Sequence, residues 1–310
     1  MTDSGGKYGV IVERNIAVPM RDGTVLRADV WRPDSEGEFP VLIERTPYDK
    51  TSSSESSLGA GEFYASHGYV TVVQDVRGRF ASDGEFYPFR DDGDGEHQDG
   101  YDTVEWAAGK GWSNGKIGTI GGSYSGSTQY QMLSSEPPHL VAQFARQSAS
   151  DYYREWVYRG GAFELGFNLK WALRHTATNA RRLAPAGSED SVEKRTGEGD
   201  ENYLLWLENT PIWPLPPVAG LHSWFQDWMS HPNAGEYWDE FTIVKAYERV
   251  GVPVHHFGSW YDCFLRGTIN NFAGMRAGAA TAGARAGQRL TIGPWVHNPG
   301  PADMRQAGAV

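Results

Sequence analysis

Along the first 150 positions, segments with the pattern of apolar and polar residues typical of strands alternate with segments typical of helices. Short runs rich in β-branched and apolar residues, bounded by Gly, Pro and Asp, predict strands. They occupy residues 10–18, 24–31, 40–44, 69–76, 116–120 and 140–147. Three segments between them predict helices, at residues 61–67, 102–108 and 124–134. The run at 69–76 is largely apolar on both faces, which is typical of a central parallel strand.

Two further strands are predicted near the end of the sequence, at residues 252–257 and 289–292. Strands and helices that alternate at these intervals predict an α/β fold, with a mostly parallel sheet and helices on both faces. The first two or three strands lie close together in the sequence, so we expect them to be antiparallel.

Residues 151–250 interrupt this alternation. They are rich in Trp, Tyr, Arg and Glu, and they predict a mainly helical insertion over the carboxyl edge of the sheet. Within the insertion, residues 184–202 predict a loop. The expected organisation is therefore a first part of the sheet domain at 1–150, the helical insertion at 151–250 and a second part of the sheet domain at 251–310.

Composition narrows the function classes. The chain has 310 residues and a net charge of −11, from 28 Lys and Arg against 39 Asp and Glu. This balance disfavours binding to nucleic acid or to anionic membranes. The single cysteine, Cys263, excludes a disulfide framework and a thiolate metal site. The polar N-terminus and the absence of long apolar runs predict a cytoplasmic protein. The acid-rich stretch 91–99 does not have EF-hand spacing and predicts a solvated turn.

The most informative motif lies at residues 118–126, which read Gly-Thr-Ile-Gly-Gly-Ser-Tyr-Ser-Gly. A serine at a sharp strand-to-helix turn, flanked by small residues, is typical of a nucleophile elbow and points to Ser123 as the nucleophile. In the usual pattern, G-x-S-x-G, the second glycine stands two positions after the serine. Here Ser125 occupies that place and Gly126 follows it. Ser125 is a rival nucleophile, but it lacks the glycine upstream.

A serine hydroxyl needs a histidine to accept its proton and a carboxylate to orient the imidazole. In this architecture the acid and the base follow late strands, in the chain order Ser, Asp or Glu, His. Asp262 follows the predicted strand 252–257, and His297 follows the predicted strand 289–292. On position alone, a purely structural role for either residue is the alternative.

Three motifs together resemble the α/β-hydrolase family of cocaine esterase, glutaryl-cephalosporin acylase, α-amino-acid ester hydrolase and X-Pro dipeptidyl peptidase. They are Gly-Gly-Ser-Tyr-Ser-Gly, Trp260-Tyr-Asp262 and Gly293-Pro-Trp-Val-His297. Further matches are Arg45-Thr-Pro-Tyr48-Asp-Lys, Gln74-Asp-Val-Arg77-Gly, Ser82-Asp-Gly84-Glu-Phe and Asp102-Thr-Val-Glu-Trp106. The resemblance covers most of residues 10–150 and 251–298 and is weak across the insertion.

The resemblance implies an α/β-hydrolase fold and a serine hydrolase that cleaves small esters or amides through an acyl-enzyme. It implies a catalytic triad of Ser123, Asp262 and His297, and an oxyanion hole made by the backbone N–H of Tyr124 and the phenol of Tyr48. A hydroxyl donor at this place suits a developing oxyanion. No metal or organic cofactor is implied, and homo-oligomerisation stays open.

Two departures from the family leave alternatives. Family members usually continue into a carboxyl-terminal β-sandwich, whereas this sequence ends soon after His297, so an inactive fragment that binds a partner is one alternative. Others are an X-Pro dipeptidyl peptidase or a β-lactam acylase. The residues from Cys263 to Arg266 include no acid to bind a substrate ammonium. Glu155 and Glu164 in the insertion are the candidates for that role, which would favour the peptidase.

Overall fold

The computed structural model describes residues 7–51, 61–208 and 211–297. The chain divides into two compact units. The sheet unit comprises Met1–Asp151 and Asp239–Val310, and the helical unit comprises Tyr152–Trp238. Each unit has a core of its own, and every residue of the predicted triad belongs to the sheet unit.

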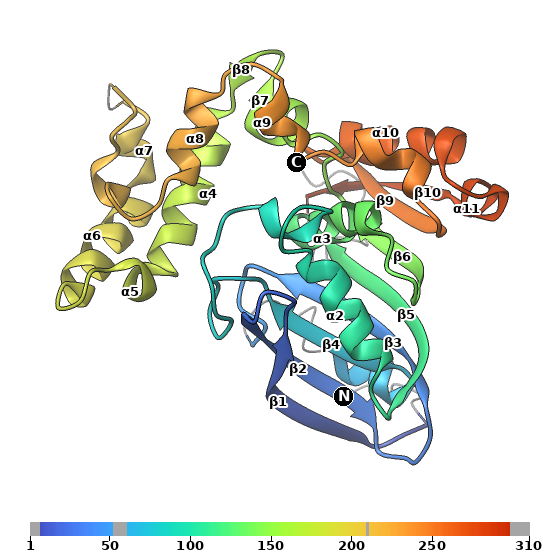
Figure 1. Ribbon diagram of the computed structural model, residues 1–310. Helices are drawn as coiled ribbons and strands as arrows, with labels where there is room; N and C mark the ends of the chain where they lie inside the picture. Colours follow the sequence, from blue (N-terminus) through green and yellow to red (C-terminus); the bar gives the residue numbers. More distant parts are fainter. Residues whose placement is uncertain (1–6, 52–60, 209–210, 298–310) are drawn as a thin grey trace. The chain divides into compact units, whose positions relative to one another are not determined.

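The sheet unit is built on a single eight-stranded sheet (Figure 1). Its strands are β1 (Val10–Pro19), β2 (Val25–Pro33), β3 (Phe39–Thr46), β4 (Val70–Asp75), β5 (Ser113–Gly122), β6 (Leu140–Arg146), β9 (Val254–Tyr261) and β10 (Arg289–Val296). They are ordered β1-β2-β4-β3-β5-β6-β9-β10. Strand β2 is antiparallel to β1 and to β4, and every other neighbouring pair is parallel. All eight predicted strands are present, and the sheet is mostly parallel as expected.

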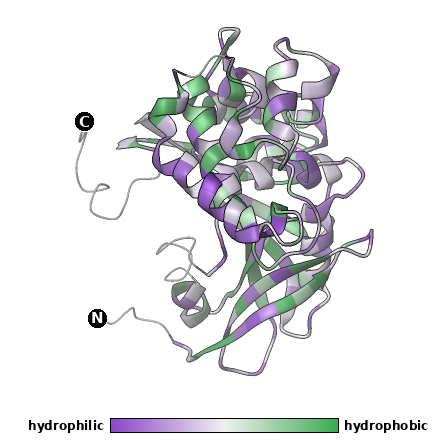
Figure 2. Ribbon diagram, turned by 90° about the vertical axis from the view of Figure 1, so that its left-hand side faces the viewer, coloured by the Kyte–Doolittle hydropathy of each residue, from purple (hydrophilic) through white to green (hydrophobic). Residues whose placement is uncertain are grey.

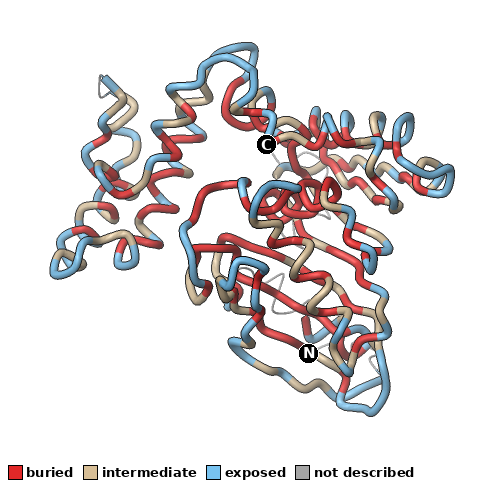
Figure 3. The backbone as a smooth tube through the Cα atoms, in the orientation of Figure 1, coloured by how far each residue is buried: buried red, intermediate tan, exposed pale blue. Residues whose placement is uncertain are grey.

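Burial explains why the central strands could be recognised from their sequence. All six residues of β4 are buried, and Figure 3 shows buried residues in red along the middle of the sheet. A strand that is covered on both faces reads as a continuous apolar run, with Val70, Val72 and Val73 as its apolar residues. Strand β1 at the sheet edge instead alternates between exposed and partly buried positions.

The helices of the sheet unit pack against these strands. They are α2 (Asp99–Ala108), α3 (Tyr124–Met132), α10 (Leu265–Gly278) and α11 (Ala282–Gly287), with short turns η1 (Arg90–Asp92), η2 (Leu133–Ser135) and η5 (Val244–Arg249). Residues 61–66 are also helical. Helices α2 and α3 contact β5, and α10 contacts β9. Figure 2 shows hydrophobic and hydrophilic residues mixed along the helices, and in α3 every residue is buried.

The helical unit is held together largely by aromatic rings. Its elements are η3 (Tyr153–Val157), β7 (Tyr158–Arg159), β8 (Ala162–Phe163), α4 (Leu165–Ala177), α5 (Ala180–Leu183), α6 (Glu189–Glu201), α7 (Tyr203–Trp206), η4 (Pro216–Val218), α8 (Trp224–Ser230) and α9 (Glu236–Asp239). The last residue of α9, Asp239, is where the chain re-enters the sheet unit. The ring of Trp171 on α4 lies 5.9 Å from that of Trp156, 5.5 Å from that of Trp224 and 6.0 Å from that of Trp228. These tryptophans therefore form an aromatic cluster within the unit, beside a smaller apolar cluster of Ala180, Val192 and Leu221.

Two predictions about the insertion are wrong. Residues 184–202 are not a loop, because helix α6 occupies most of them. The helix is hard to recognise because only Val192, Thr196 and Gly199 are buried. Residues 239–250 do not belong to the helical unit. They carry apolar side chains such as Ile243 and Val250 into the hydrophobic core of the sheet unit.

No helix within the described residues is long and apolar enough to cross a membrane.

Candidate active site

Ser123 lies at the corner between strand β5 and helix α3. Its φ of 56° and ψ of −121° are unusual for a residue with a side chain. The neighbouring glycines are needed at this corner. A Cβ on Gly121, which has φ +135°, would lie 2.5 Å from the Cβ of Ser125. A Cβ on Gly126 would lie 2.8 Å from the Cβ of Ser148. The late second glycine therefore allows α3 to approach the segment that follows β6.

The structure brings Ser123, Asp262 and His297 together, although they are far apart in the sequence. The Oγ of Ser123 lies 3.0 Å from Nε2 of His297, and Nδ1 of His297 lies 2.7 Å from Oδ1 of Asp262. This geometry suits a neutral imidazole that accepts the serine proton at Nε2 and donates Nδ1–H to the carboxylate. The rival serine, Ser125, lies inside α3 and is buried.

Asp262 lies in a tight turn that begins at the end of β9. The backbone N–H of Asp262 donates to the carbonyl of Ser259, and the N–H of Leu265 donates to the carbonyl of Asp262. The side chain of Asp262 is fully buried, whereas that of His297 is 27% exposed. Oδ2 of Asp262 is buried without a hydrogen-bond partner among the described residues. Oδ1 therefore carries the contact with the imidazole, and the thiol of Cys263 also donates to it at 3.7 Å.

The imidazole of His297 is also positioned by packing. The ring of Phe264, which is buried, lies 5.2 Å from it at an interplanar angle of 75°. Such an edge-to-face contact is a favoured arrangement for aromatic rings. The imidazole of His297 thus has polar contacts at its nitrogens and an aromatic contact against its ring.

The rings of the two residues predicted to form the oxyanion hole are in contact. Tyr124 is the first residue of α3, where a backbone N–H points out of the end of the helix. Its phenol accepts a hydrogen bond of 3.0 Å from the N–H of Phe89, which holds the ring in the interior. The ring of Tyr48 lies 6.4 Å from that of Tyr124, at an angle of 78°. The segment after β3 therefore brings Tyr48 to the residue that follows Ser123.

Buried charges hold the segment that carries Tyr48. Arg79 donates from Nε to the carbonyl of Pro47, at 2.9 Å. The backbone N–H of Lys50 donates to Oδ1 of Asp75, at 2.7 Å, and its ammonium lies 3.1 Å from Oδ2 of the same residue. Contacts on both sides of Tyr48 thus restrict its backbone.

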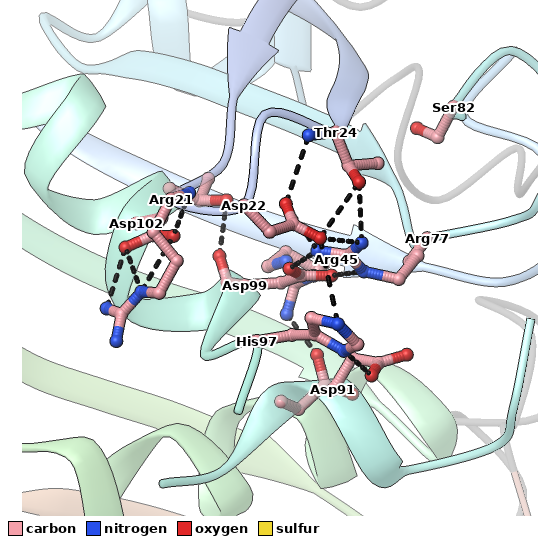
Figure 4. A network of polar contacts seen from close by, with 12 residues as sticks. Arg21, Asp22, Thr24, Arg45, Arg77, Ser82, Asp91, His97, Asp99 and Asp102 are labelled. Carbon is pink, nitrogen blue, oxygen red and sulfur yellow. Dashed lines mark hydrogen bonds and ion pairs between the residues drawn. The ribbon is translucent and has the colours of Figure 1, made fainter. Parts of the chain in front are cut away.

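A network of buried ions lies under this region (Figure 4). Arg45 at the end of β3 pairs with Asp92 and lies 3.6 Å from Asp99. Arg77 donates to both oxygens of Asp99, at 3.0 and 2.6 Å, and also to Asp22, at 2.7 Å. Each of these ions except Asp22 is nearly inaccessible to water. The network joins the first strands of the sheet to the start of α2.

The prediction that the acid-rich stretch 91–99 is a solvated turn holds for Asp94 and Glu96, which are exposed, and is wrong for its other three acids. Asp91, Asp92 and Asp99 are 9%, 3% and 0% exposed. Burial raises the pKa of Asp91 to about 6, although a hydrogen bond of 2.6 Å from His97 opposes that rise. The sequence feature that indicates the burial of these acids is the position of Arg45 and Arg77 beside apolar strand residues, because a buried arginine needs a buried acid as its partner.

The two acidic candidates in the insertion lie in the helical unit. Glu155 is buried, at 4% exposure. Glu164 forms an ion pair of 3.3 Å with Arg159.

One group of side chains within the described residues has the composition of a metal site. Potential ligand atoms of Asp262, Cys263 and His297 lie within 4.8 Å of one another. Two of these three side chains already share a hydrogen bond with each other. The hydrogen-bonded triad accounts for the proximity of Asp262 and His297.

Comparisons with known proteins agree with this architecture. A family model described as X-Pro dipeptidyl-peptidase (S15 family) matches residues 22–299. Cocaine esterase from Rhodococcus is 33% identical over 300 residues, which is 94% of this chain and 50% of that protein. A putative serine esterase from Mycobacterium bovis is 25% identical, over 91% of this chain and 51% of that protein. The chain thus spans about half the length of these curated relatives.

Solved structures show a similar fold. A CocE/NonD family hydrolase from Staphylococcus aureus has a TM-score of 0.67 at 24% identity, and the match covers 96% of this chain and 47% of that one. An α-amino acid ester hydrolase has a TM-score of 0.67 at 23% identity, with 96% and 50% covered. The α/β-hydrolase fold expected from the sequence is therefore confirmed.

Proposed function

Because the chain belongs to the X-Pro dipeptidyl-peptidase (S15) family, we propose that it is a serine hydrolase that cleaves carboxylic esters or amides. The observation that carries this proposal is the pair of contacts from Ser123 to His297 and from His297 to Asp262, at 3.0 and 2.7 Å. A hydroxyl, an imidazole and a carboxylate in this order can activate the serine at neutral pH.

In the proposed reaction the Oγ of Ser123 attacks the carbonyl carbon of the substrate while its proton passes to Nε2 of His297. The imidazolium keeps its Nδ1–H on Asp262, which stabilises the positive charge. The carbonyl oxygen becomes an oxyanion, and the backbone N–H of Tyr124 and the phenol of Tyr48 are the proposed donors to it.

The tetrahedral intermediate collapses when Nε2–H of His297 protonates the leaving alkoxide or amine. The acyl group then remains on Ser123 as an ester. Water attacks this acyl-enzyme with His297 as the base, and the same donors serve the second oxyanion. The acid product leaves, and Ser123 regains its proton.

We propose carboxylic esters as the preferred substrates. Two curated relatives are named as esterases, and an ester has a better leaving group than an amide. An amino-terminal dipeptide substrate would require acids that bind its ammonium. The residues from Cys263 to Arg266 provide none, Glu164 already pairs with Arg159, and Glu155 is buried.

The test is a comparison of p-nitrophenyl esters with aminoacyl-prolyl anilides and a β-lactam with an acyl side chain, using the full 310-residue chain. Ester turnover that is lost in S123A is the expected result. Turnover of the prolyl anilide alone would assign the protein to the peptidases. If the protein melts cooperatively, and so is folded, but turns over none of these substrates, the interpretation as a binding module is favoured over that as a hydrolase.

A further inference from the structure

Gln147 is a buried residue in an unusual backbone conformation immediately after strand β6. It has φ +46° and is 1% exposed. Residues other than glycine adopt this left-handed region at a cost, and they persist there where surrounding contacts require it. Its backbone N–H donates to the carbonyl of Phe257 at 2.7 Å, which continues the pairing of β6 with β9. The conformation turns the chain away from the sheet at this point.

The side-chain amide of Gln147 joins two segments that lead to the proposed acid and base. Nε2 donates to Oγ of Ser259 at 2.8 Å and to the carbonyl of Val296 at 2.7 Å. An amide nitrogen has two protons, so both donors are used. The carbonyl of Val296 can only accept, which fixes the orientation of the amide. Ser259 begins the turn that presents Asp262, and Val296 is the residue before His297.

The sheet is irregular just before this place, although Val296 itself pairs with Tyr261 of β9. The pairing of β10 with β9 shifts register between Gly293 and Val296. Pro294 lies within this interval and has no N–H to donate. Among the residues that the structure describes, β10 is at the edge of the sheet and β9 is its only neighbouring strand. The hydrogen bond from Gln147 therefore restrains the carbonyl that directly precedes the base.

The neighbouring residue restrains the nucleophile. The backbone N–H of Ser123 donates to the carbonyl of Arg146 at 2.9 Å. Arg146 and Gln147 thus contact the segments of all three triad members. Strands β6, β9 and β10 are consecutive in the sheet (Figure 1), so this arrangement is a property of one edge of the sheet.

We propose that Gln147 is a positioning residue that sets the backbone of His297 relative to Ser123. This inference rests on the proposed serine hydrolase activity. Without the amide, the end of β10 is free to shift, and the separation of Nε2 from Oγ is no longer held at 3.0 Å. Catalysis is sensitive to such shifts, since a displacement of about 1 Å can reduce a rate about 100-fold.

The test compares Q147M with Q143M in the 310-residue chain. Methionine keeps the length of glutamine and removes its donors. Gln143 is a matched control, because it is also a buried glutamine, lies four positions earlier within β6, and donates to the backbone carbonyl of Gln129 at 2.9 Å. The measurements are kcat and KM for a p-nitrophenyl ester, the rate of labelling by a fluorophosphonate, and the thermal midpoint.

We expect Q147M to lower kcat and the labelling rate by about 10- to 100-fold with little change in KM. Q143M should lower the thermal midpoint by a similar amount and keep kcat within about threefold of wild type. Equal effects of the two variants on kcat would overturn the positioning role. Labelling of Q147M at the wild-type rate would do the same.

A second variant covers the case in which Q147M does not fold. In Q147N, asparagine adopts the left-handed backbone readily, but its side chain is one methylene too short for the amide to reach the carbonyl of Val296. The same loss of kcat is expected, and wild-type activity of Q147N would refute the inference. If the wild-type chain itself is neither labelled nor active, the proposed function fails first, and this inference falls with it.

Discussion

The hydroxyl of Tyr130 lies 2.8 Å from Nδ1 of His256, and this contact joins the helix after Ser123 to the strand before Asp262. Nε2 of His256 lies 2.9 Å from Oε1 of Gln288, directly before β10. The neutral imidazole satisfies both partners if it accepts from Tyr130 and donates to Gln288. One buried side chain thus connects the three elements that carry the predicted triad.

Stability should depend on pH through His256. Burial lowers its pKa from the ordinary 6.5 to about 4. Between pH 4 and pH 6.5, His256 is protonated in the unfolded chain and neutral in the folded protein. Its contribution to the free energy of unfolding is therefore complete above pH 6.5 and is lost as the pH falls toward 4. The loss at low pH is at most about 3 kcal/mol. Urea unfolding of wild type and H256Q at pH 7 and pH 5 measures this contribution.

H256Q should be less sensitive to this pH change than wild type, and substitution of the exposed His231 in H231Q should leave the sensitivity unchanged. Identical pH dependence of wild type and H256Q would show that His256 does not contribute.

The buried pair of Arg45 and Asp92 should show strong coupling. R45M leaves the carboxylate of Asp92 buried without its cation, and this should lower the free energy of unfolding by about 3–5 kcal/mol. R45M/D92N removes the unpaired charge as well, so we expect it to be more stable than R45M alone. A double-mutant cycle by urea unfolding measures the coupling. Additive effects of the two substitutions would be inconsistent with the ion pair.

Helix α6 offers two glycines that should respond in opposite ways to the same substitution. A Cβ on Gly197 would meet no atom within 4 Å, whereas a Cβ on Gly199 would lie 2.5 Å from Cβ of Pro217. G197A should stabilise the protein by about 0.5–1 kcal/mol through helix propensity. G199A should destabilise it, because α6 must move away from Pro217. Thermal unfolding of both variants measures these two changes in stability. A gain in stability for G199A would contradict the close contact between Gly199 and Pro217.

The phenol of Tyr48 should contribute to turnover and little to stability. Loss of one oxyanion donor typically costs roughly 100- to 1000-fold in kcat, so Y48F should fall in that range with a similar thermal midpoint. Y247F is the matched control, since its hydroxyl donates to Asn271 at 3.0 Å and is not assigned to the reaction. Activity of Y48F equal to that of Y247F would remove Tyr48 from the proposed oxyanion hole.

The sheet was predictable because its strands are short apolar runs that end at Gly, Pro or Asp. Strand β4 is the clearest example, since every one of its residues is buried. Ser123 was recognisable from the small residues that its corner requires. Asp262 and His297 were recognisable because each follows a late strand in the chain order of this architecture.

Other features left a weak signal or a misleading one. Runs of acids are usually solvated, but Asp91, Asp92 and Asp99 are buried because Arg45 and Arg77 lie among them. Gln147 could not be found from the sequence. Its role depends on a left-handed backbone and on two hydrogen-bond partners more than 100 positions away.

Helix α6 was mistaken for a loop because its pattern lacks a wide apolar face. Its buried positions include Gly199, whose missing side chain allows a close contact with Pro217. A glycine that serves packing cannot be distinguished from one in a loop until its neighbour is known.

The central claim is that Ser123 is the nucleophile, and the most direct measurement is the site and stoichiometry of fluorophosphonate labelling. The wild-type chain should gain one adduct, which peptide mapping by mass spectrometry should place on Ser123. S123A should gain none, and S125A should still be labelled at Ser123. An adduct on Ser125, or undiminished labelling and ester turnover in S123A, would contradict the account.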